Sequence, residues 1–297
     1  VQSILETERG KLSINVCAID GSTALHIAIQ SGHNEIARML IDNGANIEFQ
    51  NDHKVTPLIL SICHNNKLLV EYILSKIDVS STSGMAVLNS KDAQNHSALD
   101  YAVLRNDEGC AISLLKKGAS IGDMTNKEFA KYMFQMFNNK MFTLVDLLLG
   151  GVYGPSVEVL NKPDNIGLTV LNYFILNKNE YLAIKVINLG VDLNTIAPVN
   201  EVNVGTILFE ACAQGLSQVV KAILKVKDRV ESIDYQWTDG STPLHASIKH
   251  SKEIAELLIK NSAQLYPVSD SGSTPLILAA YEGDKSLVEL ILKHTFA

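Results

Sequence analysis

Hydrophobic and polar positions along the chain form pairs of short segments with helical spacing. In "NEIARMLIDNGA", residues 34–45, the apolar residues Ile36, Met39 and Leu40 are spaced by three and four positions, as on one face of an α-helix. A shorter apolar segment, "STALHIAIQSG", precedes it at residues 22–32. The pattern therefore predicts two short helices that pack through their apolar faces and are separated by a turn.

The same arrangement returns along the chain at intervals of 32 to 41 residues, with one longer interval. Each shorter segment is opened by a threonine or serine, at Thr23, Thr56, Ser97, Thr169, Thr206, Thr242 and Thr274. A hydroxyl group at this position caps the free N–H groups of a helix. Glycine tolerates positive φ, so Gly32, Gly215 and Gly283 predict the end of the first helix. One interval is about twice the others, which predicts a degenerate repeat within residues 126–150.

A unit that reads T-P-L-H-x-A, then G-H, then L-L-x-x-G-A resembles the ankyrin repeat. The stretch "DGSTALHIAIQSGHNEIARMLIDNGANIE" at 20–48 matches nearly throughout, whereas Asp100, Asn172 and Glu210 stand where the histidine is expected in the middle repeats. The resemblance implies an all-α solenoid of helix-turn-helix units joined by β-hairpin-like loops, in one domain over residues 1–297. The expected units are 1–19 (partial), 20–51, 52–91, 92–125, 126–163, 164–203, 204–238, 239–269 and 270–297.

Three connections are longer than the repeat requires. They cover residues 76–91, 151–163 and 195–203. Insertions of this kind are expected as surface loops, because loop length costs little free energy. They are interpreted either as tolerated drift or as extensions of a binding face.

Composition excludes several classes of partner and compartment. The net charge of −7 disfavours a nucleic-acid partner, since phosphate binding rests on clustered Lys and Arg. The sequence contains no apolar stretch of about twenty residues, which is the length that a membrane-spanning helix needs. The four cysteines are scattered and form no C-x-x-C, which favours small buried side chains in a reducing, cytoplasmic setting.

The sequence predicts no catalytic residue, no cofactor and no metal site. His26 and His245 are the most conspicuous candidates for a general base, but the resemblance implies that they bond to the capping threonine and neighbouring backbone. The remaining histidines are scattered over different repeats, and no H-E-x-x-H motif places two of them on one helical face. We therefore expect no enzyme activity from these residues.

The resemblance implies partner contacts at the non-consensus positions of the concave face and the hairpin tips. The predicted partner-binding residues are Gln30, His64, Arg105, Asn177, Gln214, Tyr235, Trp237, Asp239, Lys249, His250, Tyr281 and Glu282.

The single tryptophan stands in "IDYQWTDGSTPLH", where the consensus is polar. Tyrosine and tryptophan are enriched at interface hot spots, so Tyr235, Trp237, Lys249, His250 and Tyr281 are predicted to form one end of a partner site. On that hypothesis Trp237→Ala abolishes partner binding and leaves the melting transition nearly unchanged. The alternative is that Trp237 folds over the helices and replaces missing consensus contacts, in which case the same change lowers stability.

These observations predict a non-catalytic, monomeric module that binds another protein. The heavy use of Asn, Lys and Ile is consistent with an AT-rich genome. The resemblance to ankyrin arrays of intracellular bacteria, protozoa and large viruses favours a secreted effector that acts in the host cytosol. One alternative is the targeting arm of a larger enzyme whose catalytic domain lies outside these residues. Another is a scaffold that forms dimers by stacking its exposed end repeats.

Overall fold

The computed structural model describes residues 14–121, 132–133, 135–150, 156–164, 166–194, 196–199, 202–226 and 233–295. The chain divides into two compact parts. The first part comprises Val1–Asp123 and Met136–Gly154, and the second comprises Met124–Gln135 and Pro155–Ala297. Each part is described by itself.

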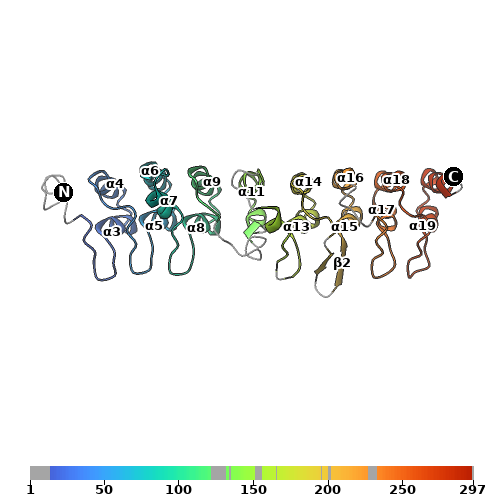
Figure 1. Ribbon diagram of the computed structural model, residues 1–297, viewed down its shortest axis with the longest axis horizontal. Helices are drawn as coiled ribbons and strands as arrows, with labels where there is room; N and C mark the ends of the chain where they lie inside the picture. Colours follow the sequence, from blue (N-terminus) through green and yellow to red (C-terminus); the bar gives the residue numbers. More distant parts are fainter. Residues whose placement is uncertain are drawn as a thin grey trace. The chain divides into compact units, whose positions relative to one another are not determined.

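The first part is built from pairs of antiparallel helices (Figure 1). The first helices of the pairs are α3 (Ala24–Gln30), α5 (Pro57–Cys63) and α8 (Ala98–Leu104). The second helices are α4 (Asn34–Asp42), α6 (Lys67–Lys76), α9 (Glu108–Lys117) and α11 (Phe142–Leu148). Each first helix packs on the next first helix and each second helix on the next second helix, so the part has two helical layers.

The second part repeats this two-layer arrangement (Figure 1). Its first helices are α13 (Val170–Leu176), α15 (Ile207–Ala213), α17 (Pro243–His250) and α19 (Pro275–Tyr281). Its second helices are α14 (Glu180–Asn188), α16 (Ser217–Lys225), α18 (Lys252–Lys260) and α20 (Lys285–Thr295). The all-α fold class expected from the sequence is confirmed.

The predicted caps open the first helices. Thr56 Oγ1 accepts a hydrogen bond from the backbone N–H of Ile59 at 3.2 Å, and Thr206 Oγ1 accepts one from Phe209 at 3.3 Å. The second contact corrects the sequence alignment, because Phe209 and not Glu210 occupies the histidine position of that repeat. Phe209 is the third residue after the capping Thr206, as His26 is the third residue after Thr23.

Most of the described first helices end on a left-handed residue, as Gly32, Gly215 and Gly283 predict, whereas α17 ends on Ser251 in extended conformation, with φ −159°. The φ angles of the three glycines are 72°, 73° and 73°. Other repeats place a non-glycine residue with positive φ at the same point: Asn65, Asn106, Lys140 and Lys178. Asparagine tolerates this region better than most residues, whereas a lysine there carries some strain. The turn geometry is therefore retained in these repeats, although their glycine is lost.

The hairpins that join the repeats are linked to one another through their backbones. Asp52 N–H donates to Asp20 O at 3.1 Å in the first part, and Asp270 N–H donates to Asp239 O at 2.8 Å in the second. Each hairpin is also closed at its base, for example by Trp237 N–H, which donates to Ser241 O at 2.8 Å. These bonds hold the hairpin tips side by side within each part.

Two second helices take their N-terminal cap from the preceding repeat. The residues that precede α11 and α16, Met141 and Leu216, have apolar side chains and make no cap of their own. Glu108 Oε1 of α9 instead accepts from Leu144 N–H at 2.9 Å, and Glu180 Oε2 of α14 accepts from Gln218 N–H at 2.9 Å. A carboxylate at a helix N-terminus is favoured both as acceptor and by the helix dipole.

The three insertions contain regular structure instead of plain loops. Residues 76–91 contain a short helix, α7 (Thr82–Leu88), whose Val87 and Leu88 are buried. Residues 151–163 contain α12 (Val157–Leu160), and the described residues of the range 195–203 lie in two paired strands, β1 (Ile196–Val199) and β2 (Val202–Thr206). The sequence predicts a surface loop for residues 76–91. In α7 the burial of two apolar side chains offsets the entropic cost of ordering that segment.

Some apolar side chains of the last repeat are exposed, although the side chains at the same positions of inner repeats are buried. Ile277 of α19 is 52% exposed, whereas Ile59, at the same position of α5, is 0% exposed. On the second helix Leu292 is 38% exposed, whereas Ile259 at the matching position of α18 is 4% exposed. Among the described residues, these side chains mark the one face of the last repeat that has no following repeat against it.

Candidate protein-binding surface

The candidate surface starts at the C-terminal ends of the first helices, where two residues per repeat point away from the core. We call these positions the end row. In the first part its predicted members are all exposed: Gln30, His64 and Arg105. In the second part Gln214 is half-buried and the other predicted members are exposed: Asn177, Lys249, His250, Tyr281 and Glu282. Because the first helices pack side by side, the end row is continuous within each part (Figure 1).

Two members of the end row also bond to the scaffold. Asn177 Nδ2 donates to the backbone oxygen of Tyr173 at 2.8 Å, which satisfies a carbonyl near the end of α13. Gln214 Nε2 donates to Glu210 Oε1 at 2.9 Å within α15. Any contact of these two side chains with a partner would have to compete with those bonds.

Tyr281 is the most exposed large apolar side chain of the end row, at 84%. It ends α19, and α19 packs against α17, whose last two residues are Lys249 and His250. The fold therefore brings three of the predicted residues to one end of the second part. An exposed tyrosine is well suited to the core of an interface, where aromatic side chains are enriched.

Trp237 lies at the base of its hairpin with its ring packed on the preceding repeat. Its ring meets Phe209 of α15 edge to face, with centroids 4.6 Å apart and an interplanar angle of 84°. The indole Nε1 is buried and has no acceptor among the described residues. A buried N–H without an acceptor costs free energy, so the ring contact must outweigh that cost.

The first repeat shows which contacts the aromatic pair replaces. There His26 Nε2 bonds the backbone oxygen of Val55 at 3.1 Å, across the boundary between two repeats. Asn51, at the position that corresponds to Trp237, accepts from the backbone N–H groups of His53 and Val55. Phe209 and Trp237 stand at the positions of His26 and Asn51, so an aromatic contact has replaced a polar one. This geometry favours the alternative in which Trp237 has a structural role.

The other two predicted hairpin residues have different environments. Tyr235 is half-buried, and Asp239 is exposed at the hairpin tip. Asp239 Oδ1 accepts from the backbone N–H of Ser241 at 2.9 Å, which supports the turn. Asp239 therefore combines a role in the turn with an accessible second carboxylate oxygen.

His26 and His245 are held by their predicted structural contacts. The Nδ1 atom of His26 lies 2.9 Å from Thr23 Oγ1, and that of His245 lies 2.8 Å from Thr242 Oγ1. His245 Nε2 bonds the backbone oxygen of Ser273 at 3.1 Å. A carbonyl only accepts, so Nε2 carries the proton in both rings. Both nitrogen atoms are occupied, which leaves neither imidazole available as a general base.

Burial lowers the pKa of both imidazoles below the ordinary value of 6.5. The unfolded chain therefore binds these protons at a higher pH than the folded chain does. Their contribution to stability is complete above about pH 6.5 and is lost as the pH falls through the lowered folded-state pKa. We expect the free energy of unfolding, measured by urea titration, to decrease as the pH falls from about 7.5 to 5.5.

A matched control for this prediction is present in the chain. Asn172 makes the same cap without a titrating group, as Thr169 N–H donates to its Oδ1 at 2.9 Å. The His26→Asn/His245→Asn variant should lose about 1 kcal/mol per inter-repeat hydrogen bond at pH 7.5. Its stability should then depend less on pH than that of the parent. Equal pH dependence of the two proteins would contradict a buried neutral state of these histidines.

A second link between hairpins and first helices, formed by a tyrosine and an aspartate, was not predicted from the sequence. The Tyr101 hydroxyl donates to Asp92 Oδ2 at 2.6 Å, and the Tyr173 hydroxyl donates to Asp164 in the same way. The hydrogen bond with Asp92 raises the pKa of Tyr101. The available signal was an Asp five residues before the capping residue together with a Tyr four residues after it, in two eroded repeats.

The described residues contain no group of three or more His, Cys, Asp or Glu side chains placed to hold a metal ion. Across the same ranges, none of the helices has both the length and the apolar character needed to cross a membrane. All four cysteines are free thiols, and Cys110 and Cys212 are buried. Burial raises the pKa of the Cys110 thiol to about 12, which makes it a poor nucleophile.

Comparison with known proteins agrees with the architecture. The family described as ankyrin repeats (3 copies) matches residues 1–83 and 208–297, which is more than half of the chain. The chain therefore belongs to the ankyrin-repeat family. Domains of this family are generally protein-interaction modules and typically non-catalytic.

Two curated relatives are much longer than this chain. It is 26% identical over 299 residues to the human transient receptor potential cation channel subfamily A member 1, over 95% of this chain and 25% of the channel. It is 35% identical over 89 residues to ankyrin repeat protein nuc-2 of Neurospora crassa, over 29% of this chain and 8% of that protein. The chain thus spans a quarter or less of the length of these relatives.

Proposed function

We propose that this chain binds a partner protein through the end row and the adjoining hairpin tips, without catalysing a reaction on it. The exposure of Tyr281 beside the helix that carries Lys249 and His250 is the observation that supports this proposal best. The scaffold gains little from leaving an aromatic ring in water, and such a ring is well suited to anchor a partner. Tyr235 and Asp239 of the neighbouring hairpin would extend the same site.

Site-specific photo-crosslinking tests the proposal. A photoreactive phenylalanine analogue placed at Tyr281 should crosslink one partner protein in extract of the cells in which the chain acts. Tyr181 is a matched control, because it is a tyrosine of the second part with 64% exposure on α14, outside the end row. Crosslinks of equal yield at both positions, or none at Tyr281, would refute a partner site there.

The free thiols support a proposal about the compartment in which the partner is met. Four unpaired cysteines, with Cys17 exposed, are expected of a protein kept in a reducing environment such as the cytosol. We propose a cytosolic partner on this ground. The interpretation as a secreted microbial effector stays a prediction from composition.

A second candidate function is that of one region within a larger protein. The similarity to the human cation channel runs over 95% of this chain but over only 25% of the channel, which favours it. In that case the repeats would dock a partner or a neighbouring domain on behalf of an attached channel or enzyme. Sequencing the complete reading frame separates the two, because a frame that encodes only ankyrin repeats removes the second candidate.

A further inference from the structure

The first helices of the first part carry an apolar patch on their exposed side. Ile27 of α3 is 45% exposed and Leu104 of α8 is 49% exposed, so a large share of each side chain lies in water. Half-buried residues of α5 and α8 complete the patch, which consists of Ile27, Leu60, Cys63, Tyr101 and Leu104. A contiguous apolar patch marks an interaction site, whereas apolar residues scattered singly need no explanation.

The patch is continuous because the three first helices lie in the same register. Asp52 N–H donates to Asp20 O at 3.1 Å at the first boundary, and Ala93 N–H donates to His53 O at 2.9 Å at the next. Each bond joins the fourth residue before one cap to the third residue before the preceding cap, so the repeats are not shifted along the helix axes. The fourth residues after the caps therefore form a row across α3, α5 and α8: Ile27, Leu60 and Tyr101.

The described first helices of the second part do not repeat this row. Glu210 of α15 is the fourth residue after its cap, is 9% exposed, and accepts from Gln214 Nε2 at 2.9 Å. Ala246 has the same place on α17. The repeat fold therefore does not require a large apolar side chain at this position, and the scaffold gains little from the exposed Ile27.

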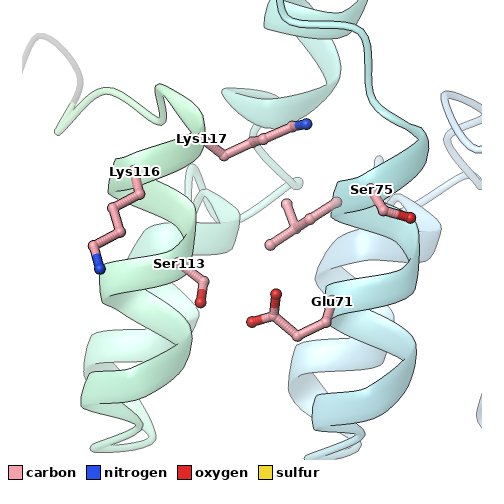
Figure 2. Close-up of a pocket in the computed structure, with 6 residues that line it drawn as sticks. Glu71, Ser75, Ser113, Lys116 and Lys117 are labelled. Carbon is pink, nitrogen blue, oxygen red and sulfur yellow. The ribbon is translucent and has the colours of Figure 1, made fainter.

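The second layer of the first part has a groove of a different character. It lies between α6 and α9, has a volume of about 360 Å³, and is lined by Glu71, Leu74, Ser75, Ser113, Lys116 and Lys117. Its one apolar residue, Leu74, is only 4% exposed, and Glu71 faces Ser113 across the gap (Figure 2). An apolar partner would gain little in this polar groove, so the apolar patch offers it the better contact.

The spacing of the patch selects one kind of partner segment. The axes of packed helices lie about 8–10 Å apart, so the members of the row repeat at about that distance. Residues seven positions apart in an α-helix lie about 10.5 Å apart along its axis, which follows the row closely. On one face of an extended strand the side chains recur about every 6.6–6.8 Å, which falls out of step with the row.

The width of the patch also favours a helix. On α5 and α8 the patch includes the seventh residue after the cap, Cys63 or Leu104, beside the fourth. A polyproline II segment repeats about every 9.3 Å but presents a single line of residues on each face. An amphipathic α-helix presents an apolar stripe two residues wide and so covers both positions.

Basic side chains border the patch at the C-terminal ends of the first helices. His64 and Arg105, the eighth residues after their caps, are exposed. Burial raises the pKa of the Cys63 thiol, and the positive charge of Arg105 opposes that rise, which places Arg105 beside the patch. A carboxylate on the flank of a partner helix would complement Arg105. The hairpin tips on the other side carry charges of both signs, Asp52 and Lys54, and set no preference.

We propose that the apolar patch binds an amphipathic helix of a partner protein, laid across α3, α5 and α8. Its apolar residues repeat every seven positions and contact Ile27, Leu60 and Tyr101 in turn, and a carboxylate on its flank faces Arg105. This inference rests on the proposed function, since it names the partner segment that the first part takes. Tyr281 belongs to the second part, so a failure here leaves crosslinking at Tyr281 to decide the proposed function.

The test is a titration of the ¹⁵N-labelled full chain with a synthetic amphipathic peptide, followed by NMR. The peptide has about 15 residues, enough to cross three helices, with leucines spaced alternately by three and four positions, glutamates on one flank and lysines on the other. Saturable shifts are expected at the amides of the patch residues. A peptide of the same composition with leucines at every second position should bind about tenfold more weakly or worse.

A proline variant of the peptide tests its conformation. Proline at two central positions of the polar face leaves the leucines in place but is incompatible with the interior of an α-helix. This peptide should give no saturable shifts. Binding that tolerates the prolines would mean that the patch takes an extended or polyproline II segment, and the proposal would be wrong.

A matched pair of variants tests the position of the site. Leu104→Ser removes an exposed side chain of the patch and should weaken binding about fivefold or more. Leu68→Ser is the control, because Leu68 is 75% exposed and lies on α6, in the second layer, so binding should be unchanged. Unchanged peaks away from the substitution show that each variant is folded.

Arg105→Gln tests the charged contact. It should weaken binding of the peptide about two- to threefold, and should have no effect on a peptide whose glutamates are replaced by glutamine. Shifts that fail to saturate overturn the proposal, as does equal affinity of the Leu104→Ser and Leu68→Ser variants or of the two leucine arrangements.

Discussion

Trp237→Ala is expected to lower the free energy of unfolding of the second part by about 2–3 kcal/mol. The ring is half-buried and packs edge to face on Phe209, which is 3% exposed, so its removal uncovers part of α15. Truncation of a fully buried tryptophan costs about 3–5 kcal/mol, and the exposed edge of Trp237 reduces that figure. Urea unfolding followed by circular dichroism measures the loss, since the variant no longer contains a tryptophan to report by fluorescence.

A double substitution tests whether the aromatic pair replaces the polar link of the first repeat. Phe209→His and Trp237→Asn each remove one half of the pair and should each destabilise the protein. Together they install the residues that stand at His26 and Asn51, so the double variant should be more stable than the sum of the two losses predicts. If the stability losses of the two single variants add up to that of the double variant, the two rings contribute to stability independently.

This result also bears on where the partner binds. If Trp237→Ala destabilises the second part, loss of binding in that variant reports lost structure as much as a lost contact. Tyr281 is the better probe, because its side chain is 84% exposed and its truncation removes little packing. A binding defect of Tyr281→Ala at unchanged stability would place the partner on the end row.

Ile59→Ala is expected to lower the free energy of unfolding of the first part by about 3 kcal/mol. Ile59 is 0% exposed, and it belongs to α5, which packs against both neighbouring first helices, α3 and α8. Removal of three buried carbon atoms there leaves a cavity that rigid neighbouring repeats close only in part. The loss should appear as a lower urea midpoint with an unchanged slope.

Ile277→Ala is the matched control for this prediction. Ile277 follows its capping threonine at the same distance and has the same side chain, but it is 52% exposed. Its truncation should change stability by no more than about 0.5 kcal/mol. A large loss at Ile277 would show that something covers the end of the last repeat in solution, and would be accompanied by a larger apparent mass in light scattering.

The repeat architecture is predictable because the residues that begin and end the helices lie within the repeat itself. A hydroxyl residue precedes each described first helix and a residue with positive φ ends most of them, so local chemistry sets the register. The places where prediction failed are those where one repeat depends on another. The contact between Phe209 and Trp237 was not predicted, because Trp237 belongs to the next hairpin.

The candidate surface was predictable only in part, for a related reason. A position at the end of a first helix can be counted from the capping residue, and the exposure of His64, Arg105 and Tyr281 follows from that count. What the count cannot supply is which side chains the scaffold uses. The bonds of Asn177 and Gln214 and the ring contact of Trp237 depend on neighbours that only the folded chain brings together.

Glu108 and Glu180 each cap a helix of the following repeat. These caps limit how the order of repeats can change in evolution or in design. Deletion of residues 164–203 would leave α16 to follow the repeat whose second helix begins at Phe142, a residue with no carboxylate to offer. Leu216 could not make up the loss. Repeats in this chain are therefore not freely exchangeable modules. Two of them can be moved, duplicated or removed only together with the neighbour that precedes them.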